Sequence, residues 1–279
     1  MSHHKRKVRH HIGRLLMLGI SLIFVLIGMI ALWVATLKMP DLNSFQNRKV
    51  IESTKIYDRT GTILLYDTGK DAKRTAIALS QIAPQVQEAT IAIEDSNFYT
   101  NIGIEPTSIV RAVIANLTTG GYGQGASTIT QQVVKNSLLT KDKTITRKIK
   151  EWVIAVKLTR VMSKEAILET YLNDTSYGGT IFGVEEASRV FFGRPAKDVT
   201  LAQAAYLAAI PQAPTYYSPY GTHRDALDAR HKLVLQRMKD LGKISKTEYD
   251  NALAEKVQFL SKEDGSIRAP HFVMFVKDL

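Results

Sequence analysis

The sequence predicts a mainly α-helical domain with a small β-hairpin region, preceded by one N-terminal transmembrane helix. Three observations lead to this fold class. From residue 83 to the segment capped at 245–248, apolar residues recur at three- and four-residue spacing, the period of amphipathic helices. Strand-like alternation is confined to residues 53–66 and 269–279. One long uncharged run lies near the N-terminus, and its length is that of a membrane span.

The composition is that of a basic, cysteine-free protein. The 279 residues carry 37 Lys and Arg against 26 Asp and Glu, a formal net charge of +11, and 45% of them are hydrophobic. This length supports one large domain or two small ones. The absence of cysteine excludes a thiolate nucleophile and a cysteine-based zinc site. The excess positive charge favours anionic lipid headgroups and phosphate-bearing substrates.

The N-terminal region predicts the topology. Residues 1–14 form a basic tail, and residues 15–37 carry no charge. As a helix this run measures about 35 Å, enough to cross a bilayer, and it is too long for the core of a cleaved signal peptide. The positive-inside rule predicts a cytoplasmic N-terminus and an outer location for everything after Lys38. That location argues against nucleic acid as a partner.

After a polar connector at residues 38–52, the first folded elements lead to a pair of acids. Residues 53–66 predict two short strands around a turn at Asp58–Gly61. Residues 83–93 predict a helix that ends at Glu94 and Asp95. Adjacent carboxylates resist burial unless counter-charges, a metal or a substrate accompany them. We therefore interpret Glu94 as a candidate catalytic base; an acidic helix end that faces water is the alternative.

Two further segments bring polar chemistry. A predicted helix after Glu105 carries an apolar stripe that fits either a core or a lipid leaflet. Four glycines between residues 120 and 125 then precede a Ser/Thr/Gln run at residues 127–132. Such a run offers neutral donors at a helix start to sugar hydroxyls or phosphate, although a capped surface loop would look the same. No Gly-Lys-Ser/Thr follows, so it is not a Walker loop.

Residues 135–164 are dense in cations, with nine Lys and Arg against Asp142 and Glu151. The helical pattern that begins at Ile145 puts Arg147, Lys148 and Glu151 on one face. An ordinary helix salt bridge is the alternative to a functional cluster. Later helices are predicted from capping residues at 164–173, 184–192, 201–210, 225–241 and from 246 onward, with a turn at Gly178–Gly179. The run 269–279 predicts a strand, and residues 261–279 the start of a linker or following domain cut from a longer protein.

Four segments in this order resemble the peptidoglycan glycosyltransferase domain (glycosyltransferase family 51) of class A penicillin-binding proteins. They are Glu94-Asp95-Ser-Asn-Phe98, Gly125-Ala-Ser127-Thr128-Ile-Thr-Gln131-Gln132 with Lys135-Asn136, Arg147-Lys148-Ile-Lys-Glu151, and Ile167-Leu-Glu-Thr-Tyr171-Leu-Asn173. A fifth, Ala204 to Pro214, also resembles it. The resemblance covers residues 53–260, the predicted domain, and the membrane anchor. Each motif is weak alone, but four in register are specific.

The resemblance implies a lysozyme-like helical fold that polymerises lipid II, with the growing glycan strand as donor and undecaprenyl pyrophosphate as leaving group. It implies a location on the outer face of the bacterial cytoplasmic membrane and competition by moenomycin. The family's functional carboxylates map onto Glu94 and Glu151. The implied substrate-binding residues are Asp95, Phe98, Ser127, Thr128, Gln131, Gln132, Lys135, Asn136, Arg147, Lys148 and Asn173.

The chemistry of these residue types agrees with the mapping. A sugar hydroxyl needs a base within reach as it attacks, which suits Glu94. The departing pyrophosphate builds up negative charge, which Arg147, Lys148 and Lys135 can stabilise. We expect Glu151 to orient these cations or to hold a divalent metal, Mg²⁺ or Mn²⁺, with Glu94 as a second metal ligand. No cofactor is required. An α-linked donor that gives a β-linked product implies a single inverting displacement.

Some features depart from the family or leave alternatives open. Two residues before Gly103, where the family usually has histidine, stands Asn101, which cannot become cationic and for which we expect a structural role. The only Ser-x-x-Lys runs from Ser2 to Lys5, and Lys-Thr-Gly is absent, so we expect no acylation by β-lactams. A transpeptidase domain beyond residue 279 or a monofunctional enzyme would both fit, with cell-wall synthesis proteins as partners. The alternatives are a lytic transglycosylase or muramidase, which has no use for the basic strip, and a non-catalytic lipid II-binding scaffold.

Overall fold

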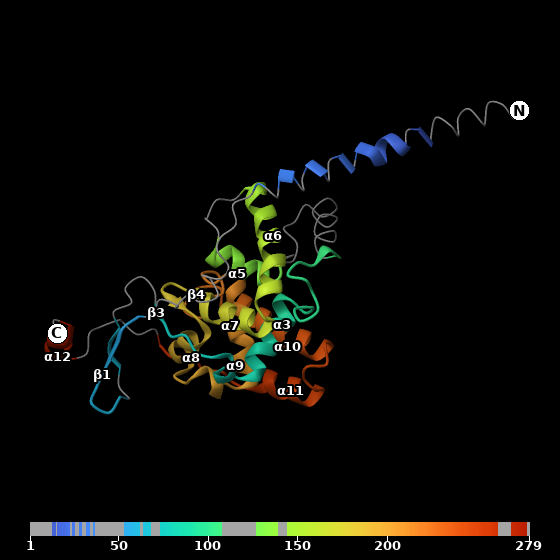
Figure 1. The fold of residues 1–279 in the computed structure, drawn as a ribbon. Helices are drawn as coiled ribbons and strands as arrows, with labels where there is room; N and C mark the ends of the chain where they lie inside the picture. The colour runs from blue at the N-terminus through green and yellow to red at the C-terminus, as the bar shows by residue number, and fades with distance from the viewer. Residues whose placement is uncertain are drawn as a thin grey trace, which may run out of the picture.

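Helices α3 (Pro84–Glu94), α9 (Leu201–Ala209) and α10 (Arg224–Asp240) pack on one another at the centre of the chain in a computed structural model (Figure 1). The structure describes residues 53–61, 64–67, 73–107, 127–138, 144–261 and 269–277, and parts of 13–36. The connector at 38–52, the apolar stripe at 109–117 and the glycine-rich segment lie outside the described residues. The described fold is mainly helical, as predicted.

Helix α9 is the innermost of the three. Its capping box forms as predicted: Thr200 Oγ1 accepts from the Gln203 amide at 3.2 Å, and the Gln203 side chain accepts from the Thr200 amide at 3.1 Å. Every residue from Ala202 to Ala209 is buried. Because alanine is small, α3 and α10 can approach this helix closely. Glu94 thus ends a helix that is anchored in the core.

A second group of helices packs beside this centre. Helix α5 (Ile129–Ser137) contacts both α6 (Ile145–Val161) and α7 (Lys164–Asp174). Helix α6 rises from the body in Figure 1. Ser163 caps α7 as predicted, its Oγ accepting from the Ala166 amide at 3.2 Å. The Ser/Thr/Gln run therefore starts helix α5, which packs against α6, the helix that carries Glu151.

Two small sheets complete the described fold. Strands β1 (Lys55–Tyr57) and β2 (Leu64–Asp67) form the predicted antiparallel hairpin, with the Gly61 amide donating to Asp58 O at 3.0 Å. The second sheet has the order β3 (Lys73–Arg74), β5 (Ile181–Phe182), β4 (Ser176–Gly178), with β3 parallel and β4 antiparallel to β5. The turn between β4 and β5 holds Gly178 and Gly179, both at positive φ. This second sheet was not predicted.

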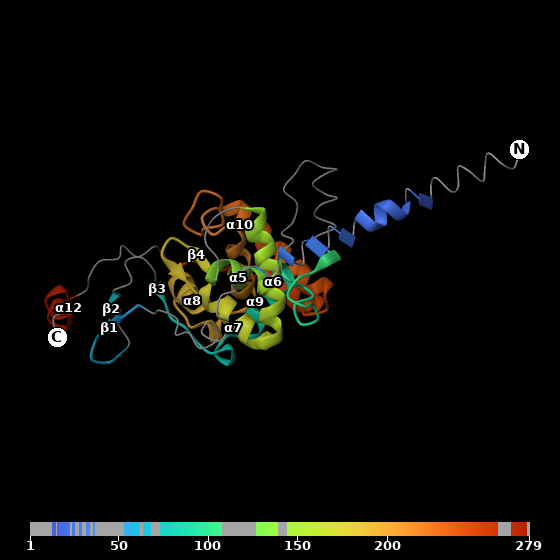
Figure 2. The same cartoon turned by 45° about the horizontal axis from the view of Figure 1, so that its top comes forward.

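The remaining elements surround the core. They are α8 (Val184–Phe192), α11 (Lys246–Ala254) and the short turns η1 (Leu79–Gln81), η2 (Ala196–Asp198) and η3 (Ile210–Gln212). Helix α8 ends at Gly193 with φ 69°, as predicted, and Ser245 caps α11. The β1–β2 hairpin and α12 (Pro270–Lys277) project from one end of the helical body in Figures 1 and 2.

The predicted strand at residues 269–279 is wrong, because residues 270–277 form helix α12. Proline at the first helical position has its φ fixed near the helical value, and its missing N–H is no loss there. Apolar runs of this length fit either a strand or a helix, and a strand would require a partner. Phe272 and Phe275 of this helix are exposed, whereas Val273 is buried.

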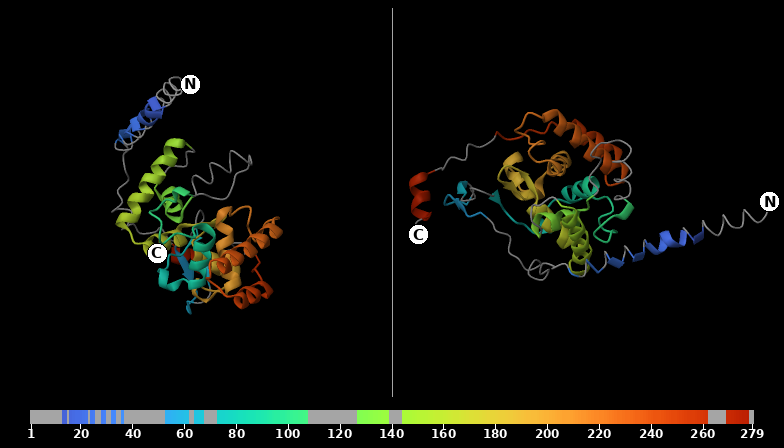
Figure 3. Two further views of the ribbon diagram at one scale, coloured as in Figure 1. Left: turned by 90° about the vertical axis from the view of Figure 1, so that its right-hand side faces the viewer. Right: turned by 90° about the horizontal axis from the view of Figure 1, so that it is seen from above.

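The N-terminal segment is described only in part. Its described residues between 13 and 36 are helical and lead away from the body in Figure 3. Among the residues that the structure describes, no helix combines the length and apolar character that a membrane crossing needs. Several residues of the run 15–37 lie outside the described part, so the transmembrane helix stays a prediction, as does the lysozyme-like architecture.

Candidate active site

Glu94 is the last residue of α3, and its side chain is 11% exposed. Its Oε2 accepts a hydrogen bond from Gln132 Nε2 on α5 at 2.7 Å. Its Oε1 lies 3.4 Å from Arg230 Nη2 on α10. The carboxylate is thus held from two sides by residues far away in the sequence.

Glu151 lies in the second turn of α6 and is 1% exposed. Its Oε1 lies 2.5 Å from Lys148 Nζ, one turn earlier on the same helix. The other oxygen, Oε2, is buried and has no hydrogen-bond partner within the described residues. The predicted common face of Lys148 and Glu151 is confirmed. Arg147 does not pair with Glu151 in the described part, and its Nε is buried without a partner there.

The start of α5 connects the two acids. Lys148 Nζ donates to Ser127 Oγ at 2.8 Å, immediately before the α5 N-cap. Gln132, in the second turn of α5, donates to Glu94. Both carboxylates are therefore tied to the first turns of one helix, Glu94 directly and Glu151 through Lys148. Within the described residues, the exposed Lys135 and Asn136 bond to neither acid.

Asp95 follows Glu94 but faces the interior. Both of its oxygens accept from Asn101 Nδ2, at 2.9 and 3.0 Å, and Oδ2 also accepts from the Ile129 amide at 3.1 Å. Burial raises the pKa of Asp95 to about 6, against the lowering effects of these bonds and of the charge of Lys164. The carboxylate therefore fixes the loop after Glu94 against the start of α5.

Asn101 is the centre of that loop. Its Oδ1 accepts from the Gly103 amide and from Lys164 Nζ, both at 2.9 Å. Gly103 has φ +94°, and a Cβ there would stand 2.5 Å from Ala155 O, so glycine lets the loop close against α6. Asn101 has the structural role we expected, with Lys164 as the cation beside it.

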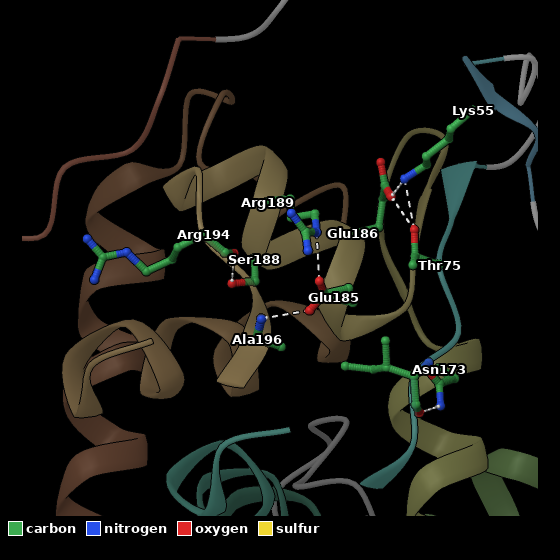
Figure 4. Close-up of polar contacts among 10 residues, drawn as sticks. Lys55, Thr75, Asn173, Glu185, Glu186, Ser188, Arg189, Arg194 and Ala196 are labelled. Carbon is green, nitrogen blue, oxygen red and sulfur yellow. Dashed lines mark hydrogen bonds and ion pairs between the residues drawn. The ribbon is translucent and has the colours of Figure 1, made fainter. Parts of the chain in front are cut away.

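The structure places five predicted substrate-binding residues inside the protein. Thr128 and Gln131 form the α5 capping box. Phe98 is fully buried, with Lys164 Nζ 4.8 Å from its ring centroid. Asn173, labelled in Figure 4, bonds through its side-chain amide to the backbone of Ile77, and it also donates to the backbone oxygen of Glu169. Together with Asp95, these side chains support the site from within and leave little surface for a substrate. Direct substrate contact stays a prediction for Ser127, Gln132, Lys135, Asn136, Arg147 and Lys148.

Three residues near the acids were not predicted as functional. Arg230 contacts Glu94. Burial raises the pKa values of Tyr171 and Tyr177 above their ordinary value, and the negative charge of Glu94 raises them further. Tyr171 stood inside a quoted motif. Arg230 lies in a highly charged predicted helix, and the spacing of residues in that helix does not indicate a contact with Glu94, which is 136 positions away.

Whether the site can hold a metal ion depends on how many ligating side chains lie close together. Among the described residues, no group of three or more His, Asp or Glu side chains gathers as a metal site requires. Each carboxylate already has a protein cation beside it, Arg230 at Glu94 and Lys148 at Glu151. The residues described therefore do not fit a metal site built from protein ligands alone, and metal binding at Glu94 and Glu151 stays a prediction.

A second group of buried acids lies on α8, away from these bonds (Figure 4). Glu186 pairs with Lys55 and accepts from Thr75 Oγ1 at 3.1 Å. Glu185 accepts from Arg189 Nε at 2.6 Å and from the Ala196 amide at 2.7 Å. These contacts tie the β1 strand and the turn after α8 to the body. Glu185 and Glu186 therefore have structural contacts, in contrast to the two acids of the candidate site.

Two carboxylates lie near the start of α5, each beside a cation, and they offer a candidate base and a candidate site for an anionic group. The family described as Transglycosylase matches residues 61–239. Penicillin-binding protein 1A from Aquifex aeolicus (strain VF5) is 38% identical over 93% of this chain and 35% of that protein. Penicillin-binding protein 1F from Bacillus subtilis (strain 168) is 42% identical over 70% of this chain and 27% of that protein.

Penicillin-binding protein 1A from Escherichia coli (strain K12) is 36% identical over 79% of this chain and 26% of that protein. A crystal structure of penicillin-binding protein 1A from Haemophilus influenzae is 23% identical and matches 83% of this chain and 24% of that chain, with a TM-score of 0.47. The chain therefore belongs to the transglycosylase family, as a peptidoglycan glycosyltransferase domain of the class A penicillin-binding protein type. It spans about a third or less of the length of these relatives.

Proposed function

We propose that this chain is a membrane-anchored enzyme that polymerises lipid II into glycan strands by inverting glycosyl transfer, with release of undecaprenyl pyrophosphate. The observation that carries the proposal is that each acid has a positive charge beside it near the start of α5: Glu94 is held by Gln132 and Arg230, and Glu151 by Lys148, which bonds to Ser127 just before the α5 N-cap. A base and a cationic site for a leaving group are the two functions that such a transfer requires. The anchor at residues 15–37 would keep the domain at the outer membrane face.

Glu94 acts in this proposal as the general base. Within the described residues, its Oε1 has only a long contact to Arg230, so it can accept the proton of the acceptor hydroxyl. The hydroxyl oxygen attacks the anomeric carbon of the donor as the carbon–oxygen bond to the pyrophosphate breaks. The electron pair of that bond leaves with the pyrophosphate, and the proton stays on Glu94. Attack opposite to the leaving group inverts the α-linked donor to a β-linked product.

Lys148 acts on the leaving-group side. It is the best placed of the three predicted cations, Arg147, Lys148 and Lys135, because Ser127 and Glu151 both fix its ammonium. Charge-assisted hydrogen bonds to the pyrophosphate strengthen as negative charge develops on it. Arg147, with a free Nε in the described part, is the second candidate. A divalent cation bound with the substrate would add charge stabilisation, but no step here depends on it.

A lipid II polymerisation assay tests the proposal. We expect the wild-type chain to form long glycan strands and moenomycin to compete. Glu94→Gln should lower kcat by at least about 10²-fold, because the amide cannot accept the proton. Glu88→Gln is the matched control on the same helix, because Glu88 forms a partly exposed ion pair with Lys243.

Each outcome distinguishes the alternatives. Shortened sacculi in place of new strands would indicate a lytic enzyme. Binding of lipid II without turnover in the wild type would indicate a scaffold. Unchanged turnover in Glu94→Gln, with native circular dichroism, would remove Glu94 from the role of base.

A further inference from the structure

The loop at residues 213–223, which joins η3 to α10, carries a pair of stacked aromatic rings at the surface. The ring centroids of Tyr216 and His223 lie 4.1 Å apart, with an interplanar angle of 27°. Tyr216 is 45% exposed, and His223 is exposed as well. Single exposed aromatic rings are ordinary, whereas a stacked pair on a loop is a feature of binding surfaces. We call this pair the Tyr216–His223 stack.

The loop beneath the stack is held in one shape. The Tyr217 amide donates to Ala213 O at 2.8 Å, which closes a turn around Tyr216. The ring of Tyr217 meets that of Tyr216 at an interplanar angle of 82°, with centroids 5.1 Å apart. Pro214 lies against β4, where a Cβ on Gly178 would stand 3.0 Å from Pro214 O. A ring that is already fixed loses little conformational freedom when a ligand packs on it.

Tyr217 also places the stack on one side of the candidate site. Its ring centroid lies 5.5 Å from the Arg230 guanidinium, and Arg230 reaches Glu94 Oε1 at 3.4 Å. Lys148, the cation assigned to the leaving group, is held instead by Glu151 on α6. The stack therefore lies on the side where the acceptor hydroxyl would meet Glu94.

The chemistry of the stack fits a sugar ring. One face of a pyranose presents C–H groups, which pack on the electron-rich face of an aromatic ring while the hydroxyls stay at the rim. A pyrophosphate requires cations, and Lys148 supplies one elsewhere in the site. Two aromatic rings beside the proposed base thus complement the saccharide of the substrate rather than its anionic part.

We propose that the Tyr216–His223 stack binds the saccharide of the acceptor, the incoming lipid II, through packing of a pyranose ring on Tyr216, which His223 holds in place. The inference rests on the proposed function. It adds the loop at residues 213–223 to a site otherwise built from α3, α5, α6 and α10. Tyr216 contributes to binding and takes no part in proton transfer, so its loss should change KM and not kcat.

Elongation kinetics of the full 279-residue chain test this, with a preformed lipid-linked glycan strand as donor, so that lipid II serves as acceptor. Tyr216→Ala should raise KM for lipid II by about fivefold and leave kcat within about twofold, the pattern of a lost aromatic contact that acts on binding alone. Tyr216→Phe keeps the ring and should stay close to wild type. His223→Ala should raise KM by about twofold, because the Tyr216 ring loses its support.

Tyr57→Ala is the matched control. Tyr57 is 41% exposed, similar to Tyr216, but it lies on strand β1 of the hairpin that projects from the body (Figure 1). Its replacement should leave KM and kcat unchanged. Circular dichroism and thermal unfolding check that every variant folds.

A second measurement does not depend on turnover. Saturation-transfer NMR with a soluble peptidoglycan disaccharide should show transfer from the protein to the C–H protons of one sugar ring. We expect this transfer in the wild type, in Tyr216→Phe and in Tyr57→Ala, and its loss in Tyr216→Ala.

An unchanged KM in Tyr216→Ala would overturn the inference, and so would saturation transfer that persists in that variant. An equal loss in Tyr216→Phe would assign the effect to the hydroxyl and refute stacking. A fall in kcat at constant KM would show that Tyr216 acts only through Tyr217 and Arg230. A wild type that forms no strands would instead refute the proposed function, and saturation transfer would then decide whether the stack binds a saccharide.

Discussion

The surroundings of Glu94 and Glu151 differ in how each negative charge is compensated. Glu151 pairs with Lys148 at 2.5 Å, three residues earlier on its own helix. Glu94 is held by Gln132 and Arg230, which lie 38 and 136 positions away. The first pair is built by one helix, and the second exists only when α3, α5 and α10 come together. The Glu94 geometry therefore depends on the tertiary fold, whereas that of Glu151 depends on α6.

This difference assigns the two acids different chemistry. Glu151 is 1% exposed, and an ammonium occupies one of its oxygens. A carboxylate in that state orients a cation well but is a poor proton acceptor. Glu94 is 11% exposed and has only a long contact from Arg230 on Oε1 within the described residues, whereas the unpartnered Oε2 of Glu151 is buried and out of reach of a substrate hydroxyl. The acids are thus not interchangeable, and replacing each should change different kinetic constants.

The largest effect that tests this comparison is expected for Glu151→Gln. Loss of the negative charge removes the partner that holds Lys148 toward the leaving-group side. We expect kcat/KM for lipid II to fall by about 10²-fold, the loss typical of one misplaced charge-stabilising donor. Steady-state kinetics in the polymerisation assay measure it.

Glu185→Gln provides the control for that experiment. Glu185 is also buried on a helix and also pairs with a cation, Arg189, one turn away (Figure 4). It bonds to neither site acid. Its replacement should lower stability and leave kcat/KM unchanged. An equal loss of activity in both variants would mean that a buried acid on a helix matters only for folding.

The contacts between residues three or four positions apart could be predicted from the sequence, because the helical period alone determines which of these residues are neighbours. Spacing put Lys148 and Glu151 on one face, and the structure confirms their ion pair. The caps at Ser163 and Thr200 were predicted in the same way, since a cap bonds to an amide three residues on. The helix that ends at Glu94 was predicted from the three- and four-residue spacing of its apolar residues, and the structure contains it as α3.

The long-range half could not be predicted. The pairing of Arg230 with Glu94 joins helices distant in the chain, and periodicity contains no information on such contacts. The β3–β5 pairing has the same cause, because strands of two residues carry no pattern of their own. Motif resemblance also cannot separate a residue that touches substrate from one beneath it, which is why the burial of Phe98 and Asn173 was not foreseen.

A smaller effect, on stability alone, is expected at Asp95, next to Glu94. Its pKa rises from 3.8 to about 6 on folding, so the folded state binds this proton more tightly than the unfolded state. The contribution is fully favourable below about pH 4 and is lost as the pH rises through about 6, on the order of 3 kcal/mol in unfolding free energy. Asp95→Asn should flatten the dependence of the unfolding free energy on pH in this range.

The measurement is the difference between the urea unfolding free energies of wild type and Asp95→Asn between pH 4 and pH 7. A difference is needed because burial lowers the pKa of His231 to about 4, which gives a contribution of opposite sign over an overlapping range. Asp240→Asn, at an exposed residue of α10, is the control. Parallel curves for wild type and Asp95→Asn would contradict the prediction.

The smallest effect tests whether α5 contributes to the Glu151 half at all. Ser127→Ala removes the acceptor that lies 2.8 Å from Lys148 Nζ but leaves the shorter contact to Glu151. A single hydrogen bond contributes about 1 kcal/mol net, so we expect a fall of about fivefold in kcat/KM for lipid II, with Ser127→Thr close to wild type because it keeps the hydroxyl. If Ser127→Ala is fully active, α6 alone positions Lys148, and the connection between the two acids through α5 exists in the structure but has no part in catalysis.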